Sequence, residues 1–204
     1  RPLRPPLSSA ARGMRIGLLG GSFNPAHAAH RMISLIALKR LGLDQVWWLV
    51  TPGNPLKNNA GLPDPARRMK EAVAVADHPR IILTDIETHI GTRYTYDTLA
   101  YLKARRPDVH FVWLMGSDNL AGFHRWARWR EIIHLMPVAV FDRPGSSFSS
   151  LHSRAAQAFA HYRIQEQAAK SMTLKQTPAF VFIHDQRSML SSTELRSRQK
   201  SVVG

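Results

Sequence analysis

The chain has 204 residues, 44% of them hydrophobic, with 28 lysines and arginines against 14 aspartates and glutamates. This length and apolar content predict a folded domain and exclude an intrinsically disordered chain. The sequence contains no cysteine, which excludes disulfides and thiolate chemistry and fits a cytoplasmic protein. No apolar stretch approaches the ~18 residues that cross a membrane. The formal net charge of +14 indicates anionic partners, either nucleic acid or small phosphorylated molecules.

Short apolar runs alternate with helical patterns along the chain. The predicted strands are residues 16–19, 46–50, 81–83, 111–115, 138–141 and 180–183. The predicted helices are residues 27–41, 67–76, 95–105, 119–135 and 153–172. This alternation predicts an α/β fold, a Rossmann-like doubly wound parallel sheet with helices on both faces and a small C-terminal helical part. Ligands of such sheets bind beyond the carboxyl ends of the strands.

The two ends of the chain differ in character from the part between them. Residues 1–13 are basic and proline-rich but lack the apolar stretch of a signal peptide. We therefore expect a flexible N-terminal extension over residues 1–13, a single domain over residues 14–197 and a basic C-terminal tail over residues 198–204.

The segment after the first predicted strand, residues 20–30, reads GGSFNPAHAAH. Its two glycines let the backbone turn sharply and approach a ligand, and Pro25 suits the first turn of the helix that follows. His27 and His30 lie three apart and therefore project from one face of that turn. Free N–H groups at a helix start, together with two imidazoles, suit phosphate oxygens. We interpret the segment as a polyphosphate-binding corner; an ordinary strand–helix turn and a zinc site are the alternatives.

Two further polar segments follow predicted strands. Residues 51–57, TPGNPLK, predict an irregular loop that presents a mobile cation, Lys57, although a plain surface lysine gives the same pattern. Residues 116–119, GSDN, place Asp118 where it can either accept hydrogen bonds from a ribose or cap the next helix.

Aromatic residues and hydroxyls suggest a site for a flat ring. Trp126 and Trp129 lie three apart in the helix predicted at residues 119–135, interleaved with Arg125, Arg128 and Arg130. This spacing is typical of a core face, but tryptophan beside arginine also suits stacking on a heterocycle. The hydroxyls of residues 94–98, YTYDT, either meet a polar substituent on that ring or cap a helix.

The last predicted strand is followed by residues 191–196, SSTELR. Serines and a threonine that open a helix, with an arginine one turn later, predict a second anion site. A capping box beside a solvated arginine is the alternative. Two anion sites at one sheet edge suit the two ends of one polyphosphate.

Six of these segments together resemble the nucleotidyltransferase superfamily of adenylyl-transferring enzymes. Within that superfamily the chain is most similar to the bacterial nicotinate-nucleotide adenylyltransferase family, from about Met14 to Arg196. The first and last motifs mark the superfamily, and the middle ones narrow the match. In order, the motifs are GGSFNPAHAAH, TPGNPLK, YTYDTL, GSDNL with a following HRW, FDRPG at Phe141–Gly145, and LSSTELR at Leu190–Arg196.

The resemblance implies an enzyme of NAD biosynthesis. Its reaction joins the adenylyl group of ATP to nicotinate mononucleotide, giving nicotinate adenine dinucleotide and pyrophosphate without a covalent enzyme intermediate. Because no tight carboxylate cluster is visible, we expect Mg²⁺ to arrive with ATP rather than in a protein cage. The expected partners are ATP and nicotinate mononucleotide, with no nucleic acid and no membrane; a homo-oligomer is left open.

The resemblance also implies roles for individual residues. The catalytic residues would be His27 and His30, which contact the ATP phosphates and stabilise charge in the transition state. The ATP-binding residues would be Gly20, Gly21, Ser22, Phe23, Gly116, Asp118, Arg143, Ser192, Thr193 and Arg196. The acceptor-binding residues would be Lys57, Thr95 and Trp126. No residue is assigned to a metal.

One departure and two alternatives remain. The family usually has glycine before the second histidine, whereas this chain has Ala29, whose methyl group could crowd a nucleotide. The nearest alternative keeps the fold and changes the acceptor to nicotinamide mononucleotide or pantetheine phosphate, or changes the reaction to a cytidylyl transfer. A different class of function, a basic RNA-binding protein, would use the positive charge and the interleaved tryptophans and arginines.

Overall fold

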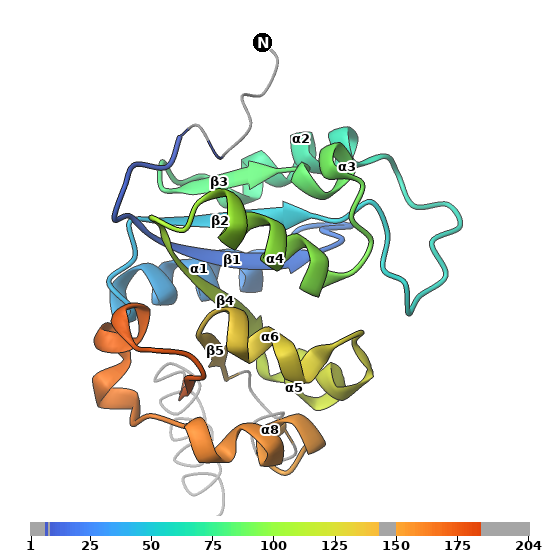
Figure 1. The fold of residues 1–204 in the computed structure, drawn as a ribbon. Helices are drawn as coiled ribbons and strands as arrows, with labels where there is room; N and C mark the ends of the chain where they lie inside the picture. Colours follow the sequence, from blue (N-terminus) through green and yellow to red (C-terminus); the bar gives the residue numbers. More distant parts are fainter. Residues whose placement is uncertain (1–6, 8, 143–149, 185–204) are drawn as a thin grey trace, which may run out of the picture.

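The computed structural model describes residues 7, 9–142 and 150–184 of the chain. Six parallel strands form one sheet in the order β3-β2-β1-β4-β5-β6, so the strand order reverses between β1 and β4 (Figure 1). The strands are β1 (Arg15–Gly21), β2 (Gln45–Val50), β3 (Ile81–Thr84), β4 (His110–Gly116), β5 (Val138–Phe141) and β6 (Phe180–Ile183). All six predicted strands and the predicted Rossmann-like fold class are confirmed.

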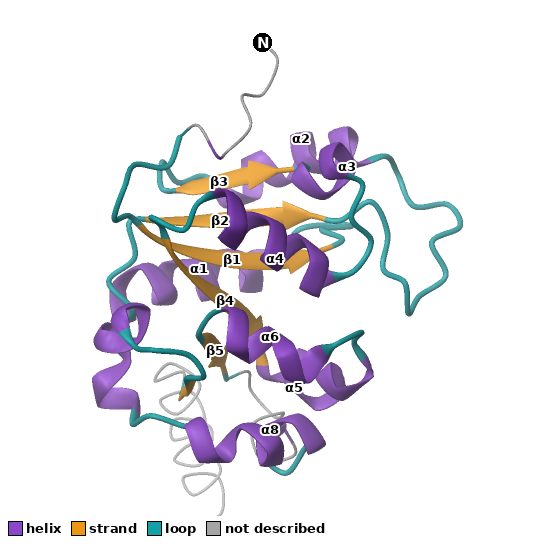
Figure 2. Ribbon diagram, in the orientation of Figure 1, coloured by secondary structure: helices purple, strands orange, loops and turns teal. Residues whose placement is uncertain are grey.

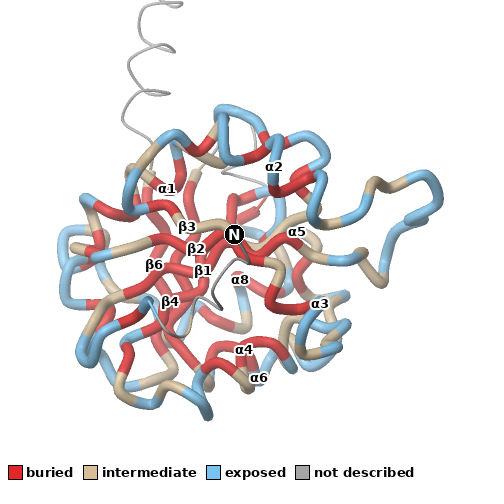
Figure 3. The backbone as a smooth tube through the Cα atoms, turned by 90° about the horizontal axis from the view of Figure 1, so that it is seen from above, coloured by how far each residue is buried: buried red, intermediate tan, exposed pale blue. Residues whose placement is uncertain are grey.

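Both faces of the sheet are buried, which is why its strands read as continuous apolar runs. Successive side chains of a strand point to opposite faces. Trp47 and Trp48 in β2 therefore enter two different core clusters, and both are fully buried. Figure 3 shows the buried strands at the centre of the molecule with the exposed loops around them.

Helices cover both faces of the sheet in two layers (Figure 2). The helices α1 (Ala28–Arg40) and α2 (Pro65–Ala76) and the 3₁₀ helix η4 (Glu166–Leu174) contribute to one core cluster. Helices on the other face contribute to the second cluster: α3 (Ile86–Ile90), α4 (Thr95–Arg105), α5 (Ser117–Gly122), α6 (Trp129–Leu135) and α8 (Arg154–Phe159). The predicted C-terminal helical part lies between β5 and β6 in the sequence, and its helices pack in these same two layers.

Two long helices predicted from the sequence are wrong as continuous helices. The segment 119–135 divides into α5, the 3₁₀ helix η2 (Phe123–Arg125) and α6, and Arg128 has a left-handed φ of 54° at the break. The segment 153–172 divides into α8, the 3₁₀ helix η3 (Ala160–Tyr162) and η4. In both segments the apolar spacing comes from core contacts made by separate short turns, so it does not require one helix.

The first described residues lie against the sheet edge. Ala10 is buried, and the Arg106 guanidinium donates hydrogen bonds to the carbonyls of Leu7 and Ala10. The backbone N–H of Gly13 donates to the carbonyl of Asp108 over 2.8 Å. These contacts attach Leu7, Ala10 and Gly13 to the connection between α4 and β4, while the proposed boundaries at 13 and 197 stay predictions.

Candidate active site

A cavity of about 620 Å³ opens at the carboxyl ends of the central strands, where the strand order reverses. Its walls come from the turn after β1, the loop after β2, the α3–α4 junction and the segment between α5 and α6. Ten of the residues predicted for the site line it: Gly20, Gly21, Ser22, Phe23, His27, His30, Lys57, Thr95, Asp118 and Trp126. The fold therefore gathers into one cavity residues that are far apart in the sequence.

The two histidines are linked at the start of α1. His27 is the residue before the helix, and its backbone N–H donates to Nδ1 of His30 over 3.1 Å. The two rings lie 4.0 Å apart between centroids. Because Nδ1 of His30 accepts this bond, the proton of its neutral ring belongs on Nε2, which can donate to an anion. Pro25, predicted in the first turn of the helix, instead lies ahead of it.

An aromatic stack fixes the position of the His30 ring. The Phe23 ring lies 4.6 Å from the ring of His30 and stacks on Trp48 at 5.0 Å with an interplanar angle of 12°. The indole N–H of Trp48 in turn donates to the hydroxyl of Ser34 on α1 over 2.8 Å. Phe23 is buried and has a positive φ of 49°, so the sharp turn of this segment occurs there.

The two glycines have a different role from the one expected. Gly20 and Gly21 are the last residues of β1, paired with Leu49 and Val50, and the turn comes after them. A Cβ atom on Gly20 would lie 2.7 Å from Cη2 of Trp113, which lines the cavity. Glycine is required at position 20 because an indole ring occupies the space of a side chain.

The loop that carries Lys57 is held by its own asparagines. The backbone N–H of Asn54 donates to Oδ1 of Asn59, and the side-chain amide of Asn59 donates back to the carbonyl of Asn54. The backbone N–H of Lys57 also donates to that carbonyl, over 3.1 Å. The loop projects from the end of β2 (Figure 1), with the exposed Lys57 lining the cavity.

A buried carboxyl group, Glu87, lies between the two halves of the cavity wall. It is 8% exposed on α3, and the hydroxyls of Thr51 and Thr98 lie within its hydrogen-bonding reach. Burial raises the pKa of Glu87 to about 7, against the opposing effect of these two hydroxyls. The sequence reasoning missed Glu87 because a single glutamate in a five-residue helix carries no pattern.

Trp126 and Thr95 form a wall on the other side. Thr95 is the first residue of α4, and Trp126 lies between η2 and α6, edge-on to Trp113 with ring centroids 6.2 Å apart. The guanidinium of Arg128 lies 3.8 Å from the centroid of the Tyr96 ring, which connects the Trp126 segment to α4.

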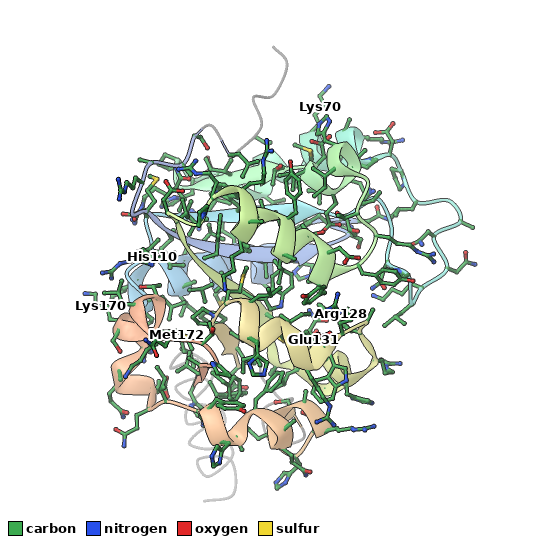
Figure 4. The ribbon with its side chains drawn as sticks, viewed as in Figure 1. Lys70, His110, Arg128, Glu131, Lys170 and Met172 are labelled. Carbon is green, nitrogen blue, oxygen red and sulfur yellow. The ribbon has the colours of Figure 1, made fainter. Side chains whose placement is uncertain are left out.

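A bidentate ion pair fixes that guanidinium. Arg128, the residue before α6, donates from Nε and Nη2 to the carboxylate of Glu131 at 2.5 and 2.9 Å, and Figure 4 labels the two residues beside one another. The hydrogen bond and the negative charge of Glu131 raise the pKa of Arg128 above its ordinary value, so the pair stays charged at neutral pH.

Five predicted site residues are not among these ten, and one of them, Gly116, is close in sequence to Asp118. Asp118 is exposed in the first turn of α5, whereas Gly116 is buried at the end of β4 and does not line the cavity. The remaining four, Arg143, Ser192, Thr193 and Arg196, lie outside the described residues. Cationic side chains that sequence reasoning missed, Arg93 and Arg125, line the cavity as well.

Within residues 7, 9–142 and 150–184 there is no group of three histidine, aspartate or glutamate side chains placed to hold a metal ion. None of the helices in this described part is long and apolar enough to cross a membrane.

Comparisons with known proteins agree with this geometry. The family model described as cytidylyltransferase-like matches residues 18–198. A protein of Methylorubrum extorquens strain PA1, named probable nicotinate-nucleotide adenylyltransferase, is 57% identical over 91% of this chain and all of its own length. A protein of Brucella suis with the same name is 52% identical over 91% of this chain and 96% of its own length.

Solved structures share the fold. Plasmodium falciparum nicotinic acid mononucleotide adenylyltransferase complexed with NaAD aligns with a TM-score of 0.62 and 20% identity, over 85% of this chain and 76% of that one. The same enzyme complexed with APC aligns with a TM-score of 0.60. The resemblance drawn from the six motifs is confirmed by the close relatives. The chain belongs to the cytidylyltransferase-like family and, within it, to the nicotinate-nucleotide adenylyltransferases.

Proposed function

We propose that this protein transfers the adenylyl group of ATP to nicotinate mononucleotide, producing nicotinate adenine dinucleotide and pyrophosphate in NAD biosynthesis. An oxygen of the mononucleotide 5′-phosphate attacks the α-phosphorus of ATP, and the bond from that phosphorus to the α,β-bridging oxygen breaks. The observation that carries the proposal is the single cavity that joins the Gly20–His30 turn to the wall of Lys57, Thr95 and Trp126. The relatives at 52–57% identity support it by their names.

The reaction requires little acid–base catalysis by the protein. The attacking phosphate is already ionised at neutral pH, so no strong base is needed, and catalysis depends on alignment and charge neutralisation. Nε2 of His30 donates to the ATP phosphates beside His27, and Gly20, Ser22 and Phe23 line the nucleotide crevice. Thr193 and Arg196 hold the β- and γ-phosphates, with Ser192 beside them.

The acceptor binds against the other wall. Trp126 stacks on the nicotinate ring and Thr95 lies near the nicotinate carboxylate, while Lys57 holds a phosphate. Asp118 and Gly116 hold the adenosine ribose, and Arg143 lies on the adenine side. These assignments rest on the motifs and, for the residues that line the cavity, on their common location.

The magnesium ion enters as part of the MgATP substrate. The described residues offer no cluster of three acidic or histidine ligands, which supports a metal carried on the triphosphate. When bound, it neutralises charge on the phosphates and on the leaving pyrophosphate.

A steady-state panel of nucleotides and acceptors tests the proposal. Pyrophosphate release with Mg²⁺ is measured for ATP and CTP, each with nicotinate mononucleotide, nicotinamide mononucleotide and pantetheine phosphate. We expect ATP with nicotinate mononucleotide to give a much higher kcat/KM than the other pairs, and mass spectrometry to identify nicotinate adenine dinucleotide. Equal kcat/KM values for the acid and the amide would contradict the acceptor preference. Pyrophosphate release with pantetheine phosphate but not with nicotinate mononucleotide would contradict the proposed function.

A further inference from the structure

A buried arginine, Arg68, lies behind the cavity and has no place in the proposed chemistry. It is on α2, and its side chain is fully buried, among the largest fully buried side chains in the described residues. Charged side chains are rarely buried to this degree unless they are paired. No carboxylate in the described part of the chain lies within ion-pair distance of its guanidinium.

The guanidinium instead binds three backbone carbonyls from three separate segments. Nη1 donates to the carbonyls of Ser22 and Thr51 over 2.7 and 2.6 Å, and Nε donates to the carbonyl of Pro63 over 2.7 Å. Ser22 lies in the turn that leads to His27. Thr51 and Pro63 mark the two ends of the loop that carries Lys57, so one side chain fixes both loop ends against the turn.

Thr51, which Arg68 binds through its carbonyl, also lies near the residues on the α3–α4 side of the cavity. The hydroxyl of Thr51 lies within hydrogen-bonding reach of Glu87, which also reaches Thr98 on α4. The hydroxyls of Thr98 and Thr92 are 2.8 Å apart, and α4 begins at Thr95. Thr51, whose carbonyl binds Arg68 and whose hydroxyl donates to the carbonyl of Gly53 over 3.1 Å, therefore lies beside the buried Glu87.

The burial of this guanidinium has an unfavourable free energy. Burying a guanidinium removes its hydration, and its Nη2 has no hydrogen-bond partner among the described residues. An apolar residue at position 68 would leave the carbonyls of Ser22, Thr51 and Pro63 without this donor, so the stabilising and positioning roles of Arg68 have to be separated by experiment. An arginine stays protonated even when buried, so its positive charge persists behind the turn.

We propose that Arg68 is a positioning residue, which sets the Ser22–His27 turn and the Lys57 loop at the separation that adenylyl transfer needs. The inference rests on the proposed function, because the two segments would hold the two nucleotides. A displacement of about 1 Å between reacting groups can cost about 100-fold in rate. The role predicts a loss in kcat that exceeds the loss in substrate affinity.

The test compares two neighbouring arginines on one helix. Arg68→Met removes the three-carbonyl contact, and Arg67→Met is its control, because Arg67 is exposed and, among the described residues, its guanidinium pairs with Glu71 over 3.4 Å. We expect Arg68→Met to lower kcat about 100-fold while KM for ATP changes by less than about threefold. Arg68→Lys, which keeps the charge but cannot span three carbonyls, should lower kcat about tenfold.

A second readout does not depend on catalysis. In hydrogen exchange, Arg68→Met should speed amide exchange about tenfold in residues 20–30 and 51–62, without changing exchange in β4. If Arg68→Met does not fold, kcat and amide exchange are measured on Arg68→Lys, and that variant tests the inference. A folded variant with the kcat and exchange of Arg67→Met would overturn the inference, as would activity loss that follows only the folded fraction. A wild-type protein inactive on nicotinate mononucleotide would overturn the proposed function, while the exchange comparison would still decide on Arg68.

Discussion

The two walls of the cavity are built in different ways. The phosphate wall is one continuous segment, residues 20–30, fixed by the end of β1, by the Phe23–Trp48 stack and by the hydrogen bond between His27 and His30. The acceptor wall combines the Lys57 loop, the start of α4 and the segment at Trp126, which meet through side chains. We expect the wall made of one continuous segment to be the more rigid of the two, and the wall assembled from three segments to be the one that adapts to an acceptor.

The largest effect should come from the phosphate wall. His30→Ala removes the imidazole that we propose donates to the ATP phosphates, and it should lower kcat about 10²–10³-fold, measured by pyrophosphate release. His30→Asn keeps a side-chain acceptor for the His27 N–H and so separates loss of the helix start from loss of the imidazole. His89→Ala is the control, because His89 is exposed, pairs with Asp85 and does not line the cavity. Normal turnover by His30→Ala would contradict the assignment.

Glu87, the buried carboxyl group between the walls, should make the stability of the fold depend on pH. Folding raises the pKa of Glu87 from 4.5 to about 7, so the folded state binds more protons than the unfolded state between these values. Its contribution to stability is therefore present below about pH 4.5 and is lost as the pH rises to about 7. Glu87→Gln cannot ionise, so its unfolding free energy relative to wild type should rise by about 2 to 3 kcal/mol from about pH 5 to about pH 8.

Chemical denaturation at the two pH values measures that difference. Glu71→Gln, at an exposed carboxylate of α2, controls for the loss of a surface glutamate. A difference for Glu87→Gln that is the same at both pH values would show that Glu87 is ionised throughout.

The contact between the walls can be tested at Gly20. Gly20→Ala places a Cβ atom against Trp113, which meets Trp126 edge-on, and should destabilise the fold by about 1–3 kcal/mol. Gly21→Ala is the matched control, since its Cβ atom would lie at an ordinary 3.4 Å from the Phe23 ring. Near-ultraviolet circular dichroism should report the tryptophan shift in the first variant only. Equal stability and equal spectra for both variants would rule out steric exclusion by the indole.

The smallest effect should come from the acceptor wall. Arg128→Ala removes the contact with Tyr96 and should raise KM for nicotinate mononucleotide about fivefold while KM for ATP stays the same. Arg130→Ala is the control, because Arg130 lies over Trp129 on its own helix, 4.6 Å from the ring centroid. An equal rise in KM for ATP would erase the proposed difference between the walls.

The sheet could be predicted from the sequence because its strands are buried on both faces. Apolar runs such as 138–141 and 180–183 match strands at the same residues in the structure. The helix at 119–135 could not be predicted correctly, because the left-handed Arg128 leaves no mark that periodicity can detect. Spacing records which side chains meet the core, and several short turns satisfy it as well as one helix.

The site was predictable where one motif carries the chemistry. The motif at residues 20–30 identified His27 and His30 as candidate site residues. It could not explain why glycine is needed at position 20, because the obstructing side chain, Trp113, is distant in the sequence. Glu87 and Arg68 were missed because each is one charged residue in a helical segment, and only the fold shows that both are buried. The site roles assigned from the motifs stay predictions for every residue, whether it lines the cavity or, like Ser192, Thr193 and Arg196, lies outside the described residues.

A crystal structure with nicotinate mononucleotide and a non-hydrolysable ATP analogue tests the central claim most directly. The account predicts the triphosphate on the Gly20–His30 turn, with His30 Nε2 within hydrogen-bond distance of a phosphate oxygen. It also predicts the acceptor phosphate in line with the bond that breaks, and the nicotinate ring against Trp126. A triphosphate bound away from that turn, or an acceptor outside the cavity, would contradict the account.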